Sequence, residues 1–421
     1  MTDATPSRAR SNISWGLLDQ VVASGSTFLF VVVAAHSVAP VELGAIAFVF
    51  ELYLLGVMIT RGVTGDPLTS RFAGRDREGL ARPIRAAATA AVLVGAGLGV
   101  LVAIGSTIAH GPLREALLVA AVALPGLTLQ DYVRSALIVQ GRVPSTFAND
   151  TFWAVVQLPA MLVAAQIHPS AGSVFGAWAA TGCLAAVIGL VQLRSGLTGP
   201  RAVRGWFAET RDLWPFYLGD NLLFQASSML LMVVVSATAG LTAMAGFRVA
   251  MTVYAPLSLI GRGVITVSVA MLARRRENPA EVRRQALLIS FVLTPLAIGW
   301  GLLTLLVPTS AGVALFGESW HEAEPVVFLA SFVCAAGLFA TGVAIGLRAL
   351  SAGRHALIGR IVVTIGAAIA SAIGGLLGEE HGLFLALAIF FPVQAAVWWG
   401  LLSHAARTPR AEGSDRGLDV Q

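Results

Sequence analysis

One short stretch of this chain occurs twice and decides the fold. Residues 59–63 read Ile-Thr-Arg-Gly-Val, and residues 260–264 read Ile-Gly-Arg-Gly-Val, a spacing of 201 residues (260 − 59 = 201). Other polar residues recur at the same spacing: Asp19 as Asp220, and Tyr53 as Tyr254. Shared charged residues inside apolar sequence indicate a duplication. Matched halves that face each other across a central site are the usual architecture of secondary transporters, so the repeat predicts a transport protein.

The composition is that of a membrane protein. Of the 421 residues, 56% are hydrophobic and only 12% are charged, whereas about a quarter are charged in a soluble domain. A helix needs about 20 apolar residues to cross a bilayer. Twelve such spans are expected, near 12–36, 43–63, 84–108, 116–140, 146–167, 171–193, 213–236, 242–271, 284–307, 325–349, 355–377 and 382–404. The sequence therefore predicts an all-α polytopic membrane protein.

The basic residues alternate between loops. All of them are Arg, and they gather before the first span and in every second loop, notably in residues 71–85, 194–211 and 274–284. The opposite loops carry Glu instead, for example Glu42 and Glu318. Because basic loops stay in the cytoplasm, both termini are predicted to be cytoplasmic. The formal net charge of +5 is thus explained by topology, and no nucleic-acid partner is expected.

Six spans in each half make the repeat parallel, with its axis along the membrane normal. The expected organisation is a cytoplasmic tail (1–11), a six-helix bundle (12–193), a basic cytoplasmic linker (194–212), a second six-helix bundle (213–404) and a cytoplasmic tail (405–421). The apolar run after Ser14 is too long for the core of a signal peptide, so it is counted as the first span.

Two segments resemble a known family. They are Ala39-Pro40-Val41-Glu42-Leu43-Gly44 at the second span, and Ala245-Gly246-Phe247-Arg248-Val249-Ala250 followed by Ala255-Pro256-Leu257 in the eighth. With the two halves and the basic linker, they are similar to the polysaccharide and lipid-linked oligosaccharide flippases of the multidrug, oligosaccharidyl-lipid and polysaccharide exporter superfamily. The resemblance implies a V-shaped pair of bundles around a polar central cavity, working by alternating access.

The resemblance also implies a substrate and a location. The expected activity moves an undecaprenyl-(pyro)phosphate-linked glycan from the inner to the outer leaflet of the bacterial cell membrane, for surface polysaccharide biosynthesis. The expected partners are this lipid-linked glycan, membrane lipids, and a polysaccharide polymerase and glycosyltransferases of the cell envelope.

Charges inside spans are costly unless they are paired, hydrated or near an end. Asp19 and Arg61 lie at similar depths in the first two spans, and Asp220 and Arg262 repeat this placement in the second half. Since both halves keep the pair, we predict two structural ion pairs, Asp19 with Arg61 and Asp220 with Arg262. A role in substrate binding is the alternative.

Residues present in only one half are the better binding candidates, because a substrate with one polar head breaks the symmetry. Arg134 lies three residues after Asp131, and Arg248 and Glu51 have uncharged counterparts. Two Arg side chains suit a pyrophosphate, whose oxygens accept paired hydrogen bonds from a guanidinium. The alternatives are an intrahelical pair of Asp131 with Arg134, an Arg248 that extends to the interface, and a Glu51 that binds a coupling ion (H⁺ or Na⁺) or merely pairs with Arg248.

Other functions are not supported. A phosphate-binding loop needs Lys, which the chain lacks, so no ATPase is expected. The longest outer segment is short (308–324) and no Asp-x-Asp pair suggests a glycosyltransferase, so an enzyme is not expected. Cys183 and Cys334 lie inside spans at a spacing that suits no metal site, and no cofactor is expected. A cation-coupled multidrug antiporter of the same superfamily and a non-transporting scaffold of a polysaccharide assembly stay open as alternatives.

Aromatic residues near span ends are interpreted mainly as interfacial anchors. Trp153 and Tyr132 are the two that could instead stack on a sugar.

Overall fold

A computed structural model describes residues 6–73, 75–273, 275, 277–350 and 352–407. Within these residues the chain is almost entirely helical and contains no β-strand. The first half comprises α1 (Pro6–Ser37), α2 (Pro40–Thr60), the π-helix η1 (Arg61–Gly65), α3 (Asp66–Phe72), α4 (Arg77–Gly105), α5 (Gly111–Val139), α6 (Val143–Ile167) and α7 (Ala171–Leu193), followed by the short α8 (Pro200–Glu209). The second half comprises α9 (Trp214–Thr238), α10 (Gly240–Val253), α11 (Ala255–Ala273), α12 (Pro279–Thr304), α13 (Thr309–Phe316), α14 (Ser319–Ala349) and α15 (Gly353–Arg407).

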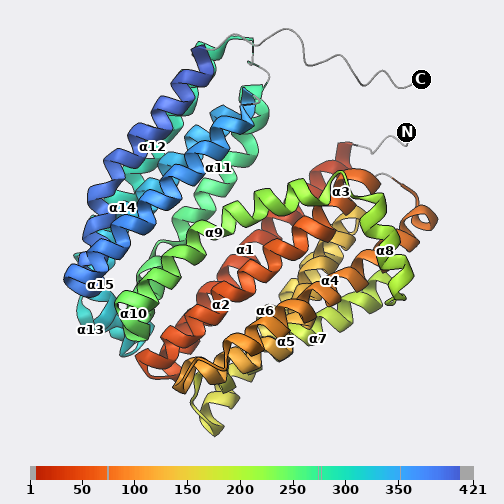
Figure 1. Cartoon of the computed structure of the whole chain (residues 1–421), viewed down its shortest axis with the longest axis horizontal. Helices are drawn as coiled ribbons and strands as arrows, with labels where there is room; N and C mark the ends of the chain where they lie inside the picture. The colour runs from red at the N-terminus through yellow and green to blue at the C-terminus, as the bar shows by residue number, and fades with distance from the viewer. Residues whose placement is uncertain (1–5, 74, 274, 276, 351, 408–421) are drawn as a thin grey trace.

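The helices form two bundles, which we call the N-lobe (α1–α7) and the C-lobe (α10–α15), with α9 running between them (Figure 1). The start of α1 and the end of α15 lie at one end of the molecule, here called the terminal end; the opposite end is called the far end (Figure 1). The lobes meet at the far end and diverge toward the terminal end (Figure 1). The sequence prediction of an all-α membrane protein with two bundles around a central cavity is confirmed.

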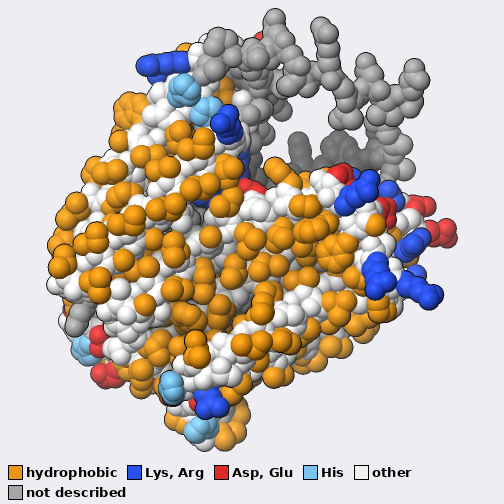
Figure 2. Space-filling view, viewed as in Figure 1, with side chains coloured by type: hydrophobic (Ala, Val, Ile, Leu, Met, Phe, Trp, Pro, Cys, Tyr) orange, Lys and Arg blue, Asp and Glu red, His pale blue; other side chains and the backbone are white. Residues whose placement is uncertain are grey.

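Length and composition qualify ten described helical segments as membrane spans, and an eleventh if the two parts of α9 are one bent span. Hydrophobic side chains cover the flank seen in Figure 2, and Arg side chains gather toward the terminal end. This surface is what a bilayer requires of a helical bundle.

The expected eighth span, 242–271, is not one helix. It is divided at Tyr254 into α10 and α11. Pro256 lies two residues after Tyr254, and a proline lacks an amide N–H and disfavours helical geometry in the residue before it. The Tyr254 hydroxyl donates to the carbonyl of Val327 in α14 at 2.7 Å, which fixes the break against the C-lobe.

The last two expected spans are confirmed as Gly353–Gly378 and His381–Arg407, although α15 is helical throughout. Their glycines show that the chain reverses direction between them. A Cβ on Gly359 would contact Trp398, one on Gly366 would contact Phe390, and one on Gly374 would overlap the carbonyl of Gly382. The two residue numbers in each pair add up to nearly the same total. This is the pattern of contacts between two antiparallel helical segments.

Helices α1 and α15 extend into the regions expected to be tails. Residues 6–11 form the first turns of α1, and residues 405–407 still belong to α15. Residues 1–5 and 408–421 lie outside the described residues, as do Arg274 and Arg276 of the expected basic loop. The four boundaries between tails, bundles and linker stay predictions.

The far end is closed by direct contacts between the lobes. In α2, a Cβ on Gly44 would overlap the carbonyl oxygen of Leu241 at the start of α10. The ring of Phe28 in α1 meets that of Phe316 in α13, with centroids 6.2 Å apart. Close approach through small residues is how helices associate in lipid, where no hydrophobic force favours association.

Candidate functional site

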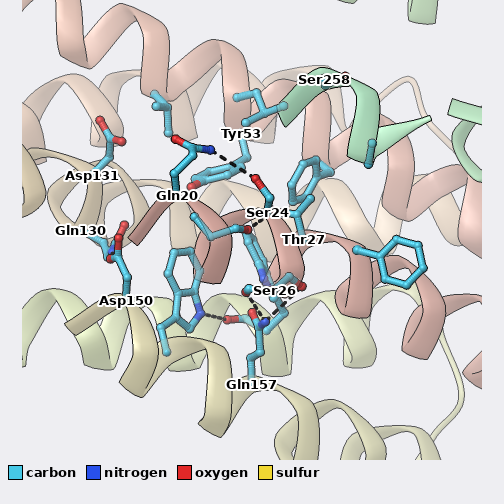
Figure 3. A pocket seen from close by; sticks show the side chains of 18 of the residues that line it. Gln20, Ser24, Ser26, Thr27, Tyr53, Gln130, Asp131, Asp150, Gln157 and Ser258 are labelled. Atoms are coloured by element: carbon cyan, nitrogen blue, oxygen red, sulfur yellow. Dashed lines mark hydrogen bonds between the residues drawn. The ribbon is translucent and has the colours of Figure 1, made fainter. Parts of the chain in front are cut away.

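A cavity of about 490 Å³ lies between the lobes and extends into the N-lobe. Its walls come from α1, α2, α5, α6 and α7 on one side and from α9, α10 and α11 on the other. Three Arg side chains line it: Arg61, Arg134 and Arg248. The remainder of the lining is mostly amide and hydroxyl side chains, aromatic rings and a few aliphatic residues, many of them drawn in Figure 3.

Arg61 and Asp131 form the first ion pair of the cavity. Arg61 Nε donates to the two carboxylate oxygens of Asp131 at 3.1 and 2.9 Å, and Nη2 donates to Oδ1 at 2.5 Å. Arg61 lies at the start of η1, and π-helical turns are frequent at functional sites. The Asp131 side chain is 7% exposed and that of Arg61 is 36% exposed, so the guanidinium faces the cavity while the carboxylate holds it from behind.

Arg134 bridges two carboxylates. Its Nη2 donates to Oδ2 of Asp19 in α1, and its Nε lies 3.3 Å from Oδ2 of Asp150 in α6. Asp150 also accepts from Nε2 of Gln130 at 3.0 Å. Asp19 is buried, and its Oδ1 has no hydrogen-bond partner among the described residues. One Arg therefore contacts two buried carboxylates.

Arg248 and Glu51 link the lobes. Arg248 Nη1 in α10 lies 3.5 Å from Oε1 of Glu51 in α2, and the guanidinium carbon lies 4.5 Å from the centre of the Phe50 ring. The other oxygen of Glu51 accepts from Gln225 and Ser228 of α9, each at 3.0 Å. Glu51 thus joins an N-lobe helix to two helices of the second half of the chain.

The predicted ion pair of Asp19 with Arg61 is wrong. The structure pairs Asp19 with Arg134 and Arg61 with Asp131 instead. The physical reason is the packing of the lobe: α1 packs mainly on α6 and barely touches α2, whereas α2 packs on α5. Arg61 and Asp19 consequently face α5 from different sides. The intrahelical pair of Asp131 with Arg134 does not form either, because each side chain binds a partner on another helix.

The second predicted pair, Asp220 with Arg262, stays a prediction. Asp220 is exposed near the start of α9, unlike buried Asp19. The side chain of Arg262 lies outside the described part of the structure. The described charges of the cavity thus come mainly from the N-lobe.

Arg248 does not extend to the membrane interface. Its side chain is only 13% exposed, lies over Phe50 and reaches Glu51. The interpretation of Glu51 as a partner of Arg248 is confirmed. Trp153 lines the cavity, so its interpretation as an interfacial anchor is wrong. Tyr132 is buried away from it and donates to the carbonyl of Ile84 at 2.8 Å.

Sequence reasoning missed Asp150, Gln157 and Gln225. Glu51 was selected because a charge inside a span is costly in lipid. The same reasoning applies to Asp150, which also lies inside an expected span. No comparable rule singles out the two glutamines.

No protein-family model matches the chain, and no curated protein matches it. Solved structures do match. A lipid II flippase MurJ in an inward closed conformation superposes with a TM-score of 0.72 at 13% identity, covering 94% of this chain and 88% of that chain. An inward-facing multidrug resistance MATE family transporter of the MOP superfamily gives 0.66 at 14% identity, covering 90% and 95%. Its outward-facing counterpart gives 0.59 at 14% identity, covering 94% and 96%.

At these identities the matches show the fold. This chain has the two-lobe fold of the multidrug, oligosaccharidyl-lipid and polysaccharide exporters.

Proposed function

We propose that this chain, a transporter by its fold, moves a lipid-linked glycan across the bacterial cell membrane from the inner to the outer leaflet. Both termini are then cytoplasmic, and the cavity of the described conformation belongs to the inward-facing state. The matched lipid II flippase makes a lipid-linked substrate compatible with this fold. A polysaccharide polymerase and glycosyltransferases stay the expected partners.

The observation that carries the proposal is the way Arg is held in the cavity. An Arg guanidinium has five N–H donors. Arg61 and Arg134 use Nε and Nη2 to bind carboxylates, and no hydrogen bond among the described residues uses Nη1 of either. The carboxylates therefore orient two guanidinium groups whose remaining donors can meet phosphate oxygens. A preoriented, partly desolvated Arg is a strong site for a (pyro)phosphate.

A cationic drug is the poorer fit. The antiporter alternative expects cavity carboxylates without Arg partners. Asp131 and Asp150 line the cavity, and each of them instead contacts an Arg. Asp19 and Glu51, which lie outside the described lining, contact an Arg as well. A cation would have to displace these guanidinium groups before it gained a carboxylate.

The coupling ion in this proposal is a proton, and its site is the pair of Asp19 and Asp150. Two buried carboxylates share Arg134 there, and a carboxyl group can bind and release a proton. Glu51 is the weaker candidate. It accepts from Gln225 and Ser228 and contacts Arg248, so both of its carboxylate oxygens already have partners.

The test is the leaflet on which the glycan accumulates. Deleting the gene is expected to leave lipid-linked glycan on the inner face, protected from an impermeant reagent that modifies only sugars exposed outside. Re-expression of the wild-type chain should restore labelling. Unchanged labelling together with new sensitivity to cationic drugs would favour the antiporter instead. Unchanged labelling without such sensitivity, while polymer assembly fails, would favour the scaffold.

A further inference from the structure

We propose that the part of the cavity formed by Trp153, Gln157 and Tyr53 is a binding site for the first sugar of the glycan, next to the Arg61 and Arg134 ion pairs. We call these three residues the sugar subsite. The inference rests on the proposed function and deepens it, because it assigns the neutral part of the substrate to particular side chains.

The first observation is a buried hydrogen-bond acceptor without a donor. Gln157 is fully buried and lines the cavity, and its Nε2 donates to Ser26 Oγ at 2.5 Å. That bond fixes the amide, yet Oε1 has no hydrogen-bond partner among the described residues. A buried acceptor left unpaired is unfavourable, so a ligand hydroxyl or amide N–H that reaches it gains more than an exposed contact would.

The second observation is a rigid aromatic ring in the same wall. Trp153 lies four residues before Gln157 on α6, about one helical turn away, and lines the cavity. Its Nε1 donates to the carbonyl of Trp178 at 3.3 Å. Its ring packs so closely on α7 that a Cβ on Gly182 would lie 2.7 Å from it. The indole is therefore fixed, and its N–H is already used, so what it offers a ligand is an apolar surface.

Tyr53 completes the subsite from α2. Its ring packs edge-on against Trp178 at 5.1 Å, and it lines the cavity. No hydrogen bond between described residues involves its hydroxyl, which can both donate and accept. A fixed ring with a few placed polar groups is the usual make-up of a small-molecule site. A pyranose has the matching surfaces: an apolar face of C–H groups and an edge of hydroxyls.

The sugar subsite and the Arg side chains lie in the same order as the sugar and the diphosphate of the substrate. Asp150, which contacts Arg134, and Gln157 are seven residues apart on α6, about 10 Å along the helix. Figure 3 shows Asp131, Gln130 and Asp150 on one side of the cavity, and Gln157 with Ser26 away from them. A diphosphate at the Arg side chains would thus place its attached sugar toward Gln157 and Trp153.

The experiment compares binding of two kinds of probe to the purified full chain in lipid nanodiscs by calorimetry. One probe is farnesyl diphosphate, and the other is farnesyl diphosphate carrying N-acetylglucosamine or galactose. The wild-type chain is expected to bind one of the sugar-bearing probes about tenfold more tightly than the bare diphosphate. Gln157→Leu and Trp153→Leu should each remove most of that preference and leave binding of the bare diphosphate unchanged, which also shows that the variants are folded.

Trp15→Leu and Gln140→Leu are the matched controls, because neither residue lines the cavity. Both should keep the wild-type preference. The subsite is refuted if the wild-type chain binds the bare and sugar-bearing probes equally, or if both Gln157→Leu and Trp153→Leu keep the preference. Failure of the bare diphosphate to bind at all would instead contradict the proposed function on which the subsite rests.

Discussion

At the scale of single residues, Arg134 is the side chain on which the N-lobe network depends. It is the basic partner of both Asp19 and Asp150, and Asp19 is buried. Arg134→Gln should lower the free energy of unfolding by about 2–3 kcal/mol. This is less than for a fully buried ion pair, because the Arg134 side chain is 25% exposed. The measurement is the thermal unfolding midpoint in detergent.

The double variant Asp19→Asn with Arg134→Gln provides the control for that prediction. Removing the carboxylate that would be left unpaired should recover part of the lost stability. A double variant no more stable than Arg134→Gln alone would show that the Asp19 contact does not hold the network together.

Asp150 carries the prediction on coupling. Transport by reconstituted wild-type chain should depend on a pH difference across the membrane. Asp150→Asn should remove that dependence, because an amide cannot exchange a proton. Glu51→Gln is the comparison and should retain the dependence even if the rate falls. A pH dependence that persists in Asp150→Asn and disappears in Glu51→Gln would move the proton site to the link between the lobes.

The ion pairs also show what one sequence could not reveal about residues. That Asp19, Arg61, Asp131 and Arg134 need partners follows from the cost of a charge in lipid. Which partner each one takes depends on whether α1 packs on α2 or on α6. The periodicity of the helices does not distinguish them.

At the scale of helices, the close approach of α2 to the start of α10 holds the far end together. Gly44→Ala should force these helices apart, because its Cβ would overlap the carbonyl of Leu241, at a cost of about 1–3 kcal/mol. Gly25→Ala in α1 is the matched control, since a Cβ there meets nothing within 4 Å. Thermal midpoints of both variants test this. Equal midpoints would mean that the helices shift apart without cost.

Element boundaries were predictable where a local cause exists. The break at Tyr254 has one in the Ala255-Pro256 sequence, although the hydrophobic run of 242–271 hides it. The reversal inside α15 has no proline at the turn, yet the low hydropathy around Glu379 and Glu380 was enough to separate the two spans. The π-helix η1 was not predicted; in the structure its Gly62 packs closely against the backbone of Leu218 in α9.

At the scale of the whole molecule, the duplication predicted two lobes around a cavity because it is a property of the entire chain. It could not predict that the charges of the cavity come mainly from the N-lobe, since that requires knowing which helices line it. The described conformation is closed at the far end by α1 and α13.

Locking that closure should stop transport. Replacing Phe28 and Phe316 by Cys, with Cys183 and Cys334 replaced by Ser, and joining the new thiols with a short bifunctional reagent should hold the lobes together at the far end. Transport should fall to background and return when a cleavable reagent is reduced. Either single Cys variant, treated identically, is the control. Full activity of the cross-linked chain would mean that the far end does not open during transport.

The most direct test of the proposed function uses the purified chain in liposomes loaded with a fluorescent polyprenyl-diphosphate sugar, in which an impermeant quencher reports the fraction in the outer leaflet. The wild-type chain should bring the inner-leaflet fraction to the outside, and a variant with Gln at both Arg61 and Arg134 should not, even where the variant remains folded. A wild-type chain that leaves the lipid-linked sugar where it started, but moves a cationic dye in the same liposomes, would contradict the account.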